Sequence, residues 1–302
     1  MARVIVLGAA GFIGCHVRQA FEADLLDDLW LVSRHVPQGD VGRWEKFDLH
    51  DHDEFVELMK RSRPEIVVNC AGRTEGSHEQ LRRANVDLTL SVVQALAQND
   101  VAARLVHIGS AAEYGAGAPG VPVVEGVATN PTSDYGRTKL LATQLVLSGP
   151  VEATVLRVFN PVGSGMGATS LIGHGIERLR SALAVGAPQI ELGPLDAYRD
   201  FVHVDDVADA VVAASRASGA IGSVINVGSG HARQARELIH LLAEVAGFRG
   251  GIVERSLGSS RSSEVSWQQA DVSRAAQKLG WLPRRDLRSG LESAWRAATA
   301  RA

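Results

Sequence analysis

The stretch SDYGRTK, residues 133–139, places a tyrosine and a lysine four positions apart. If the segment is helical, Tyr135 and Lys139 lie one turn apart on the same face, so the ammonium can sit near the phenol. An unperturbed tyrosine has a pKa of about 10, and a nearby cation lowers it toward the working range of an acid-base catalyst. The spacing therefore favours a proton-transfer pair over an ordinary pair on a solvated helix face.

A second hydroxyl lies at the end of a predicted strand. The segment VHIGSAAEYG, residues 106–115, places Ser110 at the carboxyl end of that strand, where open α/β sheets bind their ligands. A serine in such a place is often only a helix cap. Together with the tyrosine and the lysine, Ser110 is a candidate to hold the oxygen of a carbonyl substrate.

Three glycines come directly after the first predicted strand. Gly8, Gly11 and Gly14 in GAAGFIG open the first predicted helix. Glycine there permits a tight turn, close approach of the backbone to a pyrophosphate and close packing of helix on strand, while the helix N-terminus supplies amide donors. We expect a dinucleotide at this turn; the alternative is a strand-helix turn without a ligand.

Short apolar strands alternate with amphipathic helices through the first half of the chain. The strands are predicted at 3–8, 29–33, 65–70, 103–110 and 153–159. Such alternation is typical of right-handed βαβ units in a doubly wound parallel sheet, the Rossmann fold. We expect a dinucleotide-binding domain with the catalytic residues at 1–160 and a smaller C-terminal α/β substrate lobe at 161–302, with the region 200–228 returning to the first domain.

The composition is that of an α/β enzyme rather than a nucleic-acid-binding protein. The 302 residues are 45% hydrophobic and 22% charged, and the net charge of −3 offers no footprint for nucleic acid or acidic membranes. No apolar run approaches the roughly 20 residues that a membrane span needs, and MARVIVLG is a poor secretory signal, so we expect a cytoplasmic protein. Cys15 and Cys70 are expected to be reduced thiols.

The end of the second strand predicts the choice of cofactor. LVSRHVP, residues 31–37, offers Ser33 and Arg34 and no carboxylate, which suits the 2′-phosphate of NADP. NADP (NADPH) is therefore expected, with NAD as the alternative. In the nearby FDLHDHDEF, residues 47–55, His50 and His52 with Asp51 and Asp53 could suggest a metal. Acids before an apolar helix are typical of capping, so no metal is expected.

With these motifs in order, the chain resembles the extended short-chain dehydrogenase/reductase family, which includes nucleotide-sugar epimerases, dehydratases and ketoreductases. The resemblance implies that Tyr135 transfers the proton, Ser110 positions the oxygen, and Lys139 tunes the tyrosine and binds the nicotinamide ribose. It also implies further cofactor contacts, from Phe12, Ile13, Asp48, Leu49, Cys70, Ala71 and Gly72.

The same resemblance extends through the second half. Asn160 in LRVFNPVGSG matches a residue that contacts substrate, and Arg199 in LDAYRDF matches one that binds the nucleotide diphosphate. The alternative for Arg199 is a salt bridge to Asp200 or a neighbour. Arg261 and Glu264 are further candidates for contacts with the nucleotide.

The two residues directly after the serine indicate the reaction. Dehydratases of the family carry an Asp-Glu pair there, whereas this chain has Ala111 and Ala112. We expect NADPH-dependent reduction of the 4-keto group of a GDP- or dTDP-linked 4-keto-6-deoxyhexose, as in the 4-ketoreductases of nucleotide-linked deoxysugars. The alternatives are a 4-epimerase with tightly bound NAD and a non-catalytic NADP-sensing regulator. The resemblance suggests a homodimer formed through two helices per subunit, one of them the Tyr135 helix.

Overall fold

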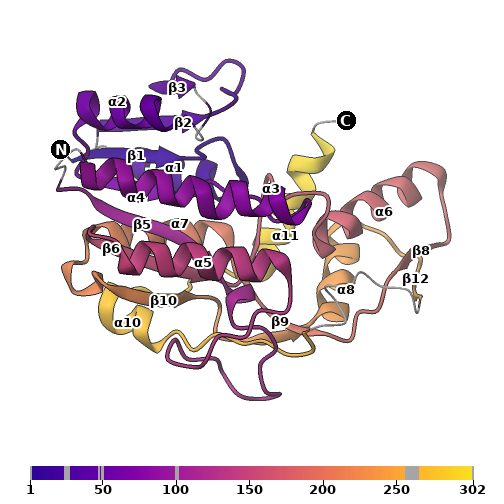
Figure 1. The fold of residues 1–302 in the computed structure, drawn as a ribbon. Helices are drawn as coiled ribbons and strands as arrows, with labels where there is room; N and C mark the ends of the chain where they lie inside the picture. Colours follow the sequence, from indigo (N-terminus) through magenta and orange to yellow (C-terminus); the bar gives the residue numbers. More distant parts are fainter. Residues whose placement is uncertain are drawn as a thin grey trace.

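Parallel strands form the central sheet of the protein (Figure 1). The computed structural model describes residues 2–23, 28–46, 48, 51–98, 102–255 and 265–300. Every neighbouring pair in the sheet is parallel. In spatial order the strands are β10 (Ser223–Val227), β6 (Ala153–Val158), β5 (Arg104–Ser110), β4 (Ile66–Asn69), β1 (Arg3–Leu7), β2 (Asp28–Ser33) and β3 (Trp44–Lys46).

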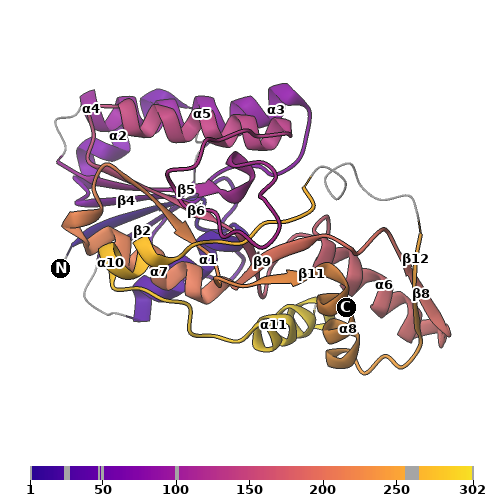
Figure 2. The same cartoon turned by 90° about the horizontal axis from the view of Figure 1, so that it is seen from below.

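Helices cover both faces of this sheet, as Figure 2 shows. One face carries α2 (His52–Ser62), α3 (His78–Arg82), α4 (Leu88–Gln98) and α5 (Asp134–Ser148), and the other carries α1 (Phe12–Ala23), α7 (Val204–Arg216) and α10 (Ser273–Leu279). Strand residues alternate between the two cores: Val4 and Val6 pack beneath α1 and α7, while Ile5 and Leu7 pack beneath α2 and α4. All four are fully buried, which explains the continuous apolar runs of the sequence. The predicted doubly wound parallel sheet is confirmed.

The chain leaves the central sheet after β6 and later re-enters it. Helix α7 packs on the α1 face, β10 pairs in parallel with β6, and α10 adds Ala275 to the same core. The domain boundaries expected at residue 160 and around 200–228 stay predictions.

The intervening segments build a smaller lobe beside the carboxyl edge of the sheet (Figure 2). Its strands are β7 (Asn160–Val162), β9 (Tyr198–His203) and β11 (Ala232–Gln234) in one sheet, and β8 (Gln189–Leu192) and β12 (Gly251–Glu254) in another. Its helices are α6 (Leu171–Val185), α8 (Ala235–Val245) and α11 (Leu287–Thr299). A separate apolar core centred on Ile176, Leu179 and Leu238 joins these elements.

A buried carboxylate fixes β9 against its surroundings. Asp200 is completely buried and accepts hydrogen bonds from the amides of Ser229 (2.6 Å), Gly230 (2.9 Å) and Ala270 (3.0 Å), and from the Ser229 hydroxyl. Burial raises the pKa of this carboxyl, and the hydrogen bonds oppose that effect. Two chain segments, at residues 229–230 and at residue 270, are thereby held to the strand that carries Arg199.

The start of α7 differs from the capping that its sequence suggests. Asp205 and Asp206 resemble N-cap residues, but the N-cap is His203, whose Nδ1 accepts from the Asp205 amide. The two carboxylates instead make tertiary contacts: Asp205 with His16, and Asp206 with the backbone and guanidinium of Arg285. Helical spacing alone does not reveal partners so distant in the sequence.

Among the residues described, no helix is both long enough and apolar enough to cross a membrane.

Candidate active site

A cavity of about 680 Å³ opens at the carboxyl edge of the central sheet, facing the smaller lobe. Six predicted cofactor residues line it: Gly11, Phe12, Ile13, Cys70, Ala71 and Gly72. The predicted catalytic residues Ser110, Tyr135 and Lys139 and the predicted substrate residues Asn160 and Arg199 line the same cavity. The fold thus brings eleven of the expected site residues together, and their roles stay predictions.

The glycine turn lies at the floor of this cavity, at the N-terminus of α1. Gly8 adopts φ +73°, and a Cβ on it would lie 2.9 Å from the Ala71 backbone. A Cβ on Gly14 would lie 2.1 Å from the Gly8 carbonyl oxygen. No larger residue fits either place, so these two glycines permit the close approach of α1 to β1 and β4, while Gly11 faces the cavity.

Three of the predicted contacts to the adenosine end, Ser33, Arg34 and Asp48, lie outside the cavity lining. Ser33, at the end of β2, accepts a long hydrogen bond from the His35 amide (3.4 Å). Arg34 is exposed and makes no hydrogen bond or ion pair within the described part of the chain. Asp48 is exposed before α2, and Leu49 lies outside the described residues.

The acidic residues after β3 lie at the N-terminus of α2. Asp51 is the N-cap of α2 and accepts from the Glu54 amide at 3.1 Å. No group of three or more His, Cys, Asp or Glu side chains in the described ranges could hold a metal ion.

Ser110 begins a one-turn helix, η2 (Ala111–Glu113), at the end of β5. Its hydroxyl accepts from the Ala112 amide at 3.2 Å, and its own amide donates to Glu113 at 2.8 Å. The hydroxyl proton is then available to a substrate oxygen in the cavity. Ser110 therefore acts as a cap and a candidate donor at once.

Glu113 points away from the cavity. It is fully buried and pairs with Arg157 of β6 at 2.7 Å, and that guanidinium lies 4.4 Å from the centre of the Tyr114 ring. Ala111 and Ala112 do line the cavity, so the two places directly after the serine offer no carboxylate for acid-base chemistry.

Tyr135 and Lys139 occupy the first turns of α5. Ser133 caps this helix by accepting from the Gly136 amide at 3.1 Å, and the helix presents both side chains to the cavity. Lys139 is only 5% exposed and donates to the Ile108 carbonyl of β5. This bond ties the lysine to the strand that ends in Ser110.

Burial governs the electrostatics of the lysine. Desolvation lowers the pKa of Lys139 to about 8, against the opposing influence of Glu113 and Cys70. Burial also raises the pKa of the Cys70 thiol to about 12, so this cysteine is an inert wall residue. Lys139 is therefore mostly an ammonium at neutral pH and becomes half deprotonated at a pH of about 8.

Asn85 is a site residue that the sequence does not reveal. Between α3 and α4 the chain forms a π-helical turn, η1 (Arg83–Asp87), and Asn85 in this turn lines the cavity. Its amide bonds the Arg73 backbone and the Thr138 hydroxyl (3.0 Å), and Thr138 donates to the Tyr135 carbonyl. Asn85 therefore joins the cofactor-side loop to the tyrosine helix.

Gln268 is a second such residue. It is 5% exposed, lines the cavity, and donates from Nε2 to the carbonyls of Ala111 (2.8 Å) and Gly115 (3.2 Å). Because both partners can only accept, the amide nitrogen faces them and the side-chain oxygen lies at the other end. An acceptor is thus fixed beside the Ser110 turn, in a segment whose sequence gives no motif for it.

Arg199 of β9 brings positive charge to the lobe side of the cavity. Its guanidinium donates to the Tyr198 carbonyl at 2.9 Å and pairs with no carboxylate in the described ranges. Burial lowers its pKa to about 10. The alternative salt bridge to Asp200 is absent because Asp200 faces Ser229 and Ala270. A half-buried cation that no described carboxylate neutralises is suited to an anionic ligand.

Asn160 lines the same cavity as Arg199, and the pairing of β7 with β9 fixes its position. Its amide donates to the Asp200 carbonyl at 2.8 Å across the β7–β9 contact. Arg261 and Glu264, the other two expected nucleotide contacts, lie outside the described residues.

The family is decided by comparison with known proteins. Residues 4–228 match the model of the NAD dependent epimerase/dehydratase family. The chain belongs to this family. The resemblance to extended short-chain dehydrogenases/reductases is thereby confirmed.

Relatives of the chain act on nucleotide-linked deoxysugars. It is 39% identical, over 98% of its length and 95% of the relative's, to dTDP-6-deoxy-L-talose 4-dehydrogenase (NAD(P)(+)) of Kitasatospora kifunensis. It is 28% identical, over 96% of its length and 95% of the relative's, to GDP-6-deoxy-D-mannose reductase of Pseudomonas aeruginosa. The protein is thus a member of a group of enzymes that modify nucleotide sugars.

A solved structure shares the whole fold. RMD from Pseudomonas aeruginosa, complexed with NADPH, superimposes with a TM-score of 0.86 at 26% identity, and the match covers 100% of both chains. The expectation of NADP, with NAD as the alternative, is consistent with these relatives.

Turnover should fall as the pH rises above about 8. Because burial lowers the pKa of Lys139 to about 8, the ammonium that supports Tyr135 is present below that pH and lost above it. We expect kcat/KM of the free enzyme to decline roughly tenfold per pH unit on the alkaline side. Re-assay at neutral pH after each incubation controls for inactivation, and a profile that stays flat to about pH 10 would contradict this role.

Arg199→Ala should weaken binding of a nucleoside diphosphate by roughly ten- to a hundredfold, as expected for loss of a charged hydrogen-bond donor. Titration calorimetry with dTDP and GDP measures this directly. Arg233→Ala is the matched control, since Arg233 is the exposed register partner of Arg199 on β11. Equal affinity of the Arg199 variant and the wild type would exclude a diphosphate contact.

Proposed function

We propose that the protein uses NADPH to reduce the 4-keto group of a nucleotide-linked 4-keto-6-deoxyhexose, with dTDP or GDP as the nucleotide. The observation that carries the proposal is the convergence of Ser110, Tyr135 and Lys139 in one cavity with Arg199, which pairs with no carboxylate among the described residues. A proton donor and an oxygen-binding hydroxyl suit carbonyl reduction, and Arg199 suits the diphosphate.

The residues present fit a dinucleotide. Gly8 and Gly14 keep the turn free of side chains, so the backbone of Gly11–Ile13 at the N-terminus of α1 is open to the cavity. That backbone would hold the pyrophosphate. Lys139 and Tyr135 would contact the nicotinamide ribose, as the family resemblance implies. When bound, NADPH supplies the hydride for the carbonyl carbon.

The protein's own residues then handle the oxygen. Ser110 donates a hydrogen bond to the carbonyl oxygen, and this bond strengthens as negative charge develops there. The Tyr135 phenol gives its proton to the alkoxide, so the phenolate remains on the enzyme until a solvent proton replaces the one transferred. The Lys139 ammonium favours that phenolate by its charge.

The end of β2 supports NADPH over NADH. Ser33 and Arg34 stand where an NAD-binding member usually has an acid, and no described residue neutralises Arg34. A guanidinium and a hydroxyl suit the 2′-phosphate dianion. The same feature disfavours an epimerase that retains NAD.

The names of the relatives support the substrate class. Both act on 6-deoxyhexoses, one linked to dTDP and the other to GDP, and both names describe oxidation or reduction. The absence of acids at Ala111 and Ala112 agrees with a reaction that eliminates no water. The greater identity to the dTDP enzyme makes dTDP sugars the first to test.

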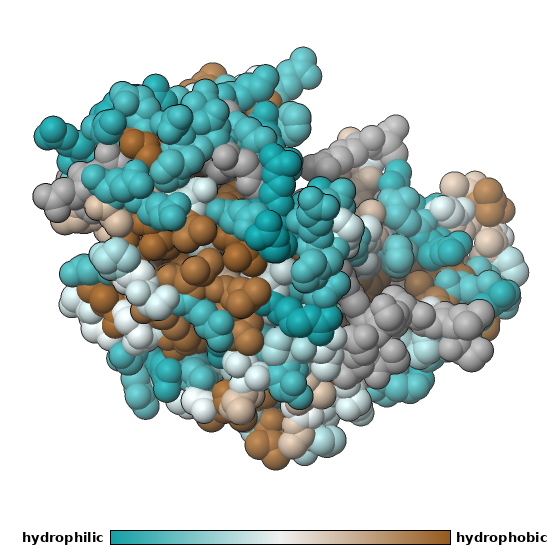
Figure 3. Space-filling model, in the orientation of Figure 1, coloured by the Kyte–Doolittle hydropathy of each residue, from teal (hydrophilic) through white to brown (hydrophobic). Residues whose placement is uncertain are grey.

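We extend the proposal to a homodimer. Helices α4 and α5 lie side by side on one face and expose Leu90, Leu141 and Leu147, whose exposed fractions are 37%, 49% and 39%. Figure 3 shows apolar surface gathered over these helices. Pairing of two copies through this face would cover the leucines and brace the helix that carries Tyr135.

The proposal is tested by incubating the protein with NADPH and a panel of dTDP- and GDP-linked 4-keto-6-deoxyhexoses while monitoring the absorbance of the reduced nicotinamide. We expect stoichiometric consumption with at least one sugar. Tyr135→Phe, which keeps the ring but removes the proton, should lower kcat by roughly 10²- to 10⁴-fold and leave NADPH binding nearly unchanged.

The other outcomes identify the alternatives. Isomerisation of a nucleotide sugar without net use of cofactor would indicate an epimerase. Binding of NADPH with no conversion across the panel would indicate a sensing protein. Near-normal turnover by the Tyr135→Phe variant would remove the tyrosine from the mechanism.

A further inference from the structure

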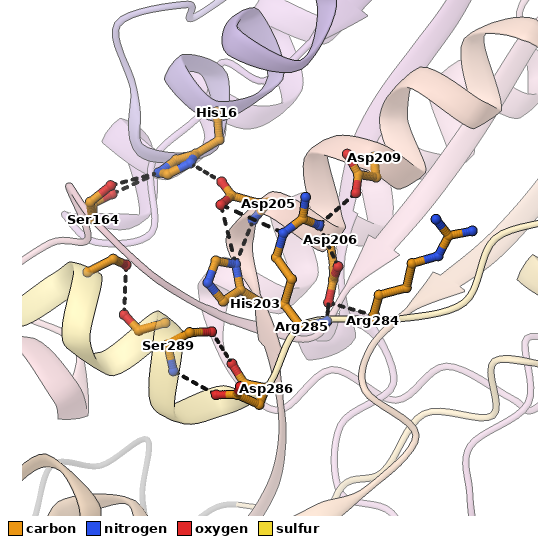
Figure 4. Close-up of polar contacts among 12 residues, drawn as sticks. His16, Ser164, His203, Asp205, Asp206, Asp209, Arg284, Arg285, Asp286 and Ser289 are labelled. Carbon is orange, nitrogen blue, oxygen red and sulfur yellow. Dashed lines mark hydrogen bonds and ion pairs between the residues drawn. The ribbon is translucent and has the colours of Figure 1, made fainter. Parts of the chain in front are cut away.

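A buried histidine on the cofactor helix lies where the two halves of the protein meet. His16 is on α1, one turn after Phe12, and is only 6% exposed. Its ring lies between Ser164, in the loop after β7, and Asp205, at the start of α7 (Figure 4). None of the reaction steps described above uses it.

Both ring nitrogens of His16 face oxygen atoms that accept hydrogen bonds. Nδ1 lies 2.5 Å from Asp205 Oδ1, and Nε2 lies 2.9 Å from the Ser164 carbonyl oxygen. A carboxylate and a carbonyl have no proton to give, so these two contacts are both hydrogen bonds only when both nitrogens carry hydrogen and the ring is an imidazolium. The Ser164 hydroxyl, 3.3 Å from Nε2, then accepts from the ring as well. Burial, which disfavours the cation, is outweighed by the bonds to Asp205, Cys15 and Ser164, and the pKa of His16 is raised to about 10.

The charges around this cation come from several elements. The Asp205 carboxylate, whose pKa is lowered mainly by its bond to His16, also lies 3.7 Å from His203 Nδ1 and 4.0 Å from Arg285 Nε. His203 Nδ1 accepts from the Asp205 amide, and burial lowers the pKa of His203, so this second ring is neutral. Cys15, on the same helix, donates to the Phe12 carbonyl. Arg285 in turn pairs with Asp206 at 2.7 Å and with Asp209 at 2.6 Å. The network thus contains three carboxylates and two cations, His16⁺ and Arg285.

The other partner of His16 opens a segment that forms the cavity wall. Gly165, Met166 and Gly167 line the cavity directly after Ser164. Gly165 adopts φ +82° and faces Phe12, since a Cβ built on it would lie 4.0 Å from the Phe12 ring. A segment so rich in glycine has little stiffness of its own, so its path depends on outside anchors.

We propose that the His16 imidazolium is a positioning residue: by bridging Asp205 and the Ser164 carbonyl, it holds the 163–167 segment over the cavity in fixed relation to the cofactor helix. The role of that segment in binding the nucleotide sugar rests on the proposed function. The bridge itself, and its dependence on the charge of the ring, can be measured without substrate.

The first test is hydrogen–deuterium exchange of the 163–167 amides, measured by mass spectrometry. The His16→Gln variant keeps a polar side chain but removes the cation. In this variant we expect the 163–167 amides to exchange about tenfold faster or more, while the α5 amides keep wild-type rates. His240→Gln, exposed on α8, is the matched control and should behave as wild type. Unchanged exchange in the His16 variant would overturn the proposal.

The second test retains the ring and removes its anion. In Asp205→Asn the pKa of His16 should fall toward or below its ordinary value, because burial is then less opposed. Protection of the 163–167 segment, corrected for intrinsic exchange, should then be lost as the pH rises through neutrality, whereas the wild type keeps it to about pH 9. Titration of the His16 ring by ¹⁵N NMR should give the same midpoint. Protection that is independent of pH in this variant would show that the charge plays no part.

The third test measures the kinetics of the His16→Gln variant. His16→Gln should raise KM for the nucleotide sugar at least roughly tenfold with a smaller effect on kcat, because the segment orders the bound sugar. An unaltered KM would exclude this role. If the wild type itself reduces no 4-keto sugar, the proposed function fails, while the exchange and titration results still decide whether the bridge exists.

Discussion

The carboxyl ends of β1, β4, β5 and β6 meet at one edge of the central sheet because every neighbouring pair of strands is parallel. This edge receives the glycine turn after β1, the Cys70–Gly72 segment after β4, Ser110 at the end of β5 and Asn160 after β6. Groups far apart in the sequence therefore face one cavity without any long loop. Helix α5 adds the tyrosine and the lysine from the adjacent layer, and its position is fixed by the lysine's bond to β5.

Buried charge determines how these groups behave. Glu113 neutralises Arg157 beneath the serine turn, and Asp200 is satisfied by backbone amides and one hydroxyl. Both carboxylates are therefore occupied by structural partners and do not compete for ligands. Arg199 and Lys139 line the cavity as cations without carboxylate contacts in the described ranges. Positive charge is thus left for the proposed diphosphate and cofactor, and no acid among the described residues lines the cavity where a ketone would react.

The sequence predicts well the site features that depend on residues close together in the chain. The glycine turn, the strand-end serine and the Tyr135–Lys139 pair each combine a local motif with a strand or helix that must carry it, and all of them lie at the expected edge. The sequence does not predict the positions of three further residues, Asn85, Gln268 and His16, because their contacts join segments far apart in the sequence. Asn85 also lies in a π-helical turn, whose pattern of apolar residues resembles that of an ordinary helix. Asp205 misleads for the same reason: its carboxylate contacts α1 instead of capping α7.

The most direct test of the central claim is the fate of the hydride. NADPH carrying deuterium at both C4 positions of the nicotinamide, incubated with the protein and a dTDP-linked 4-keto-6-deoxyhexose, should place deuterium at C4 of the sugar as the ketone becomes an alcohol, with one NADP⁺ formed per product. NMR of the product gives the position of the label. Product that contains no deuterium from added NADPH, or sugar inverted at C4 without oxidation of the cofactor, would contradict the assignment of the protein as a 4-ketoreductase.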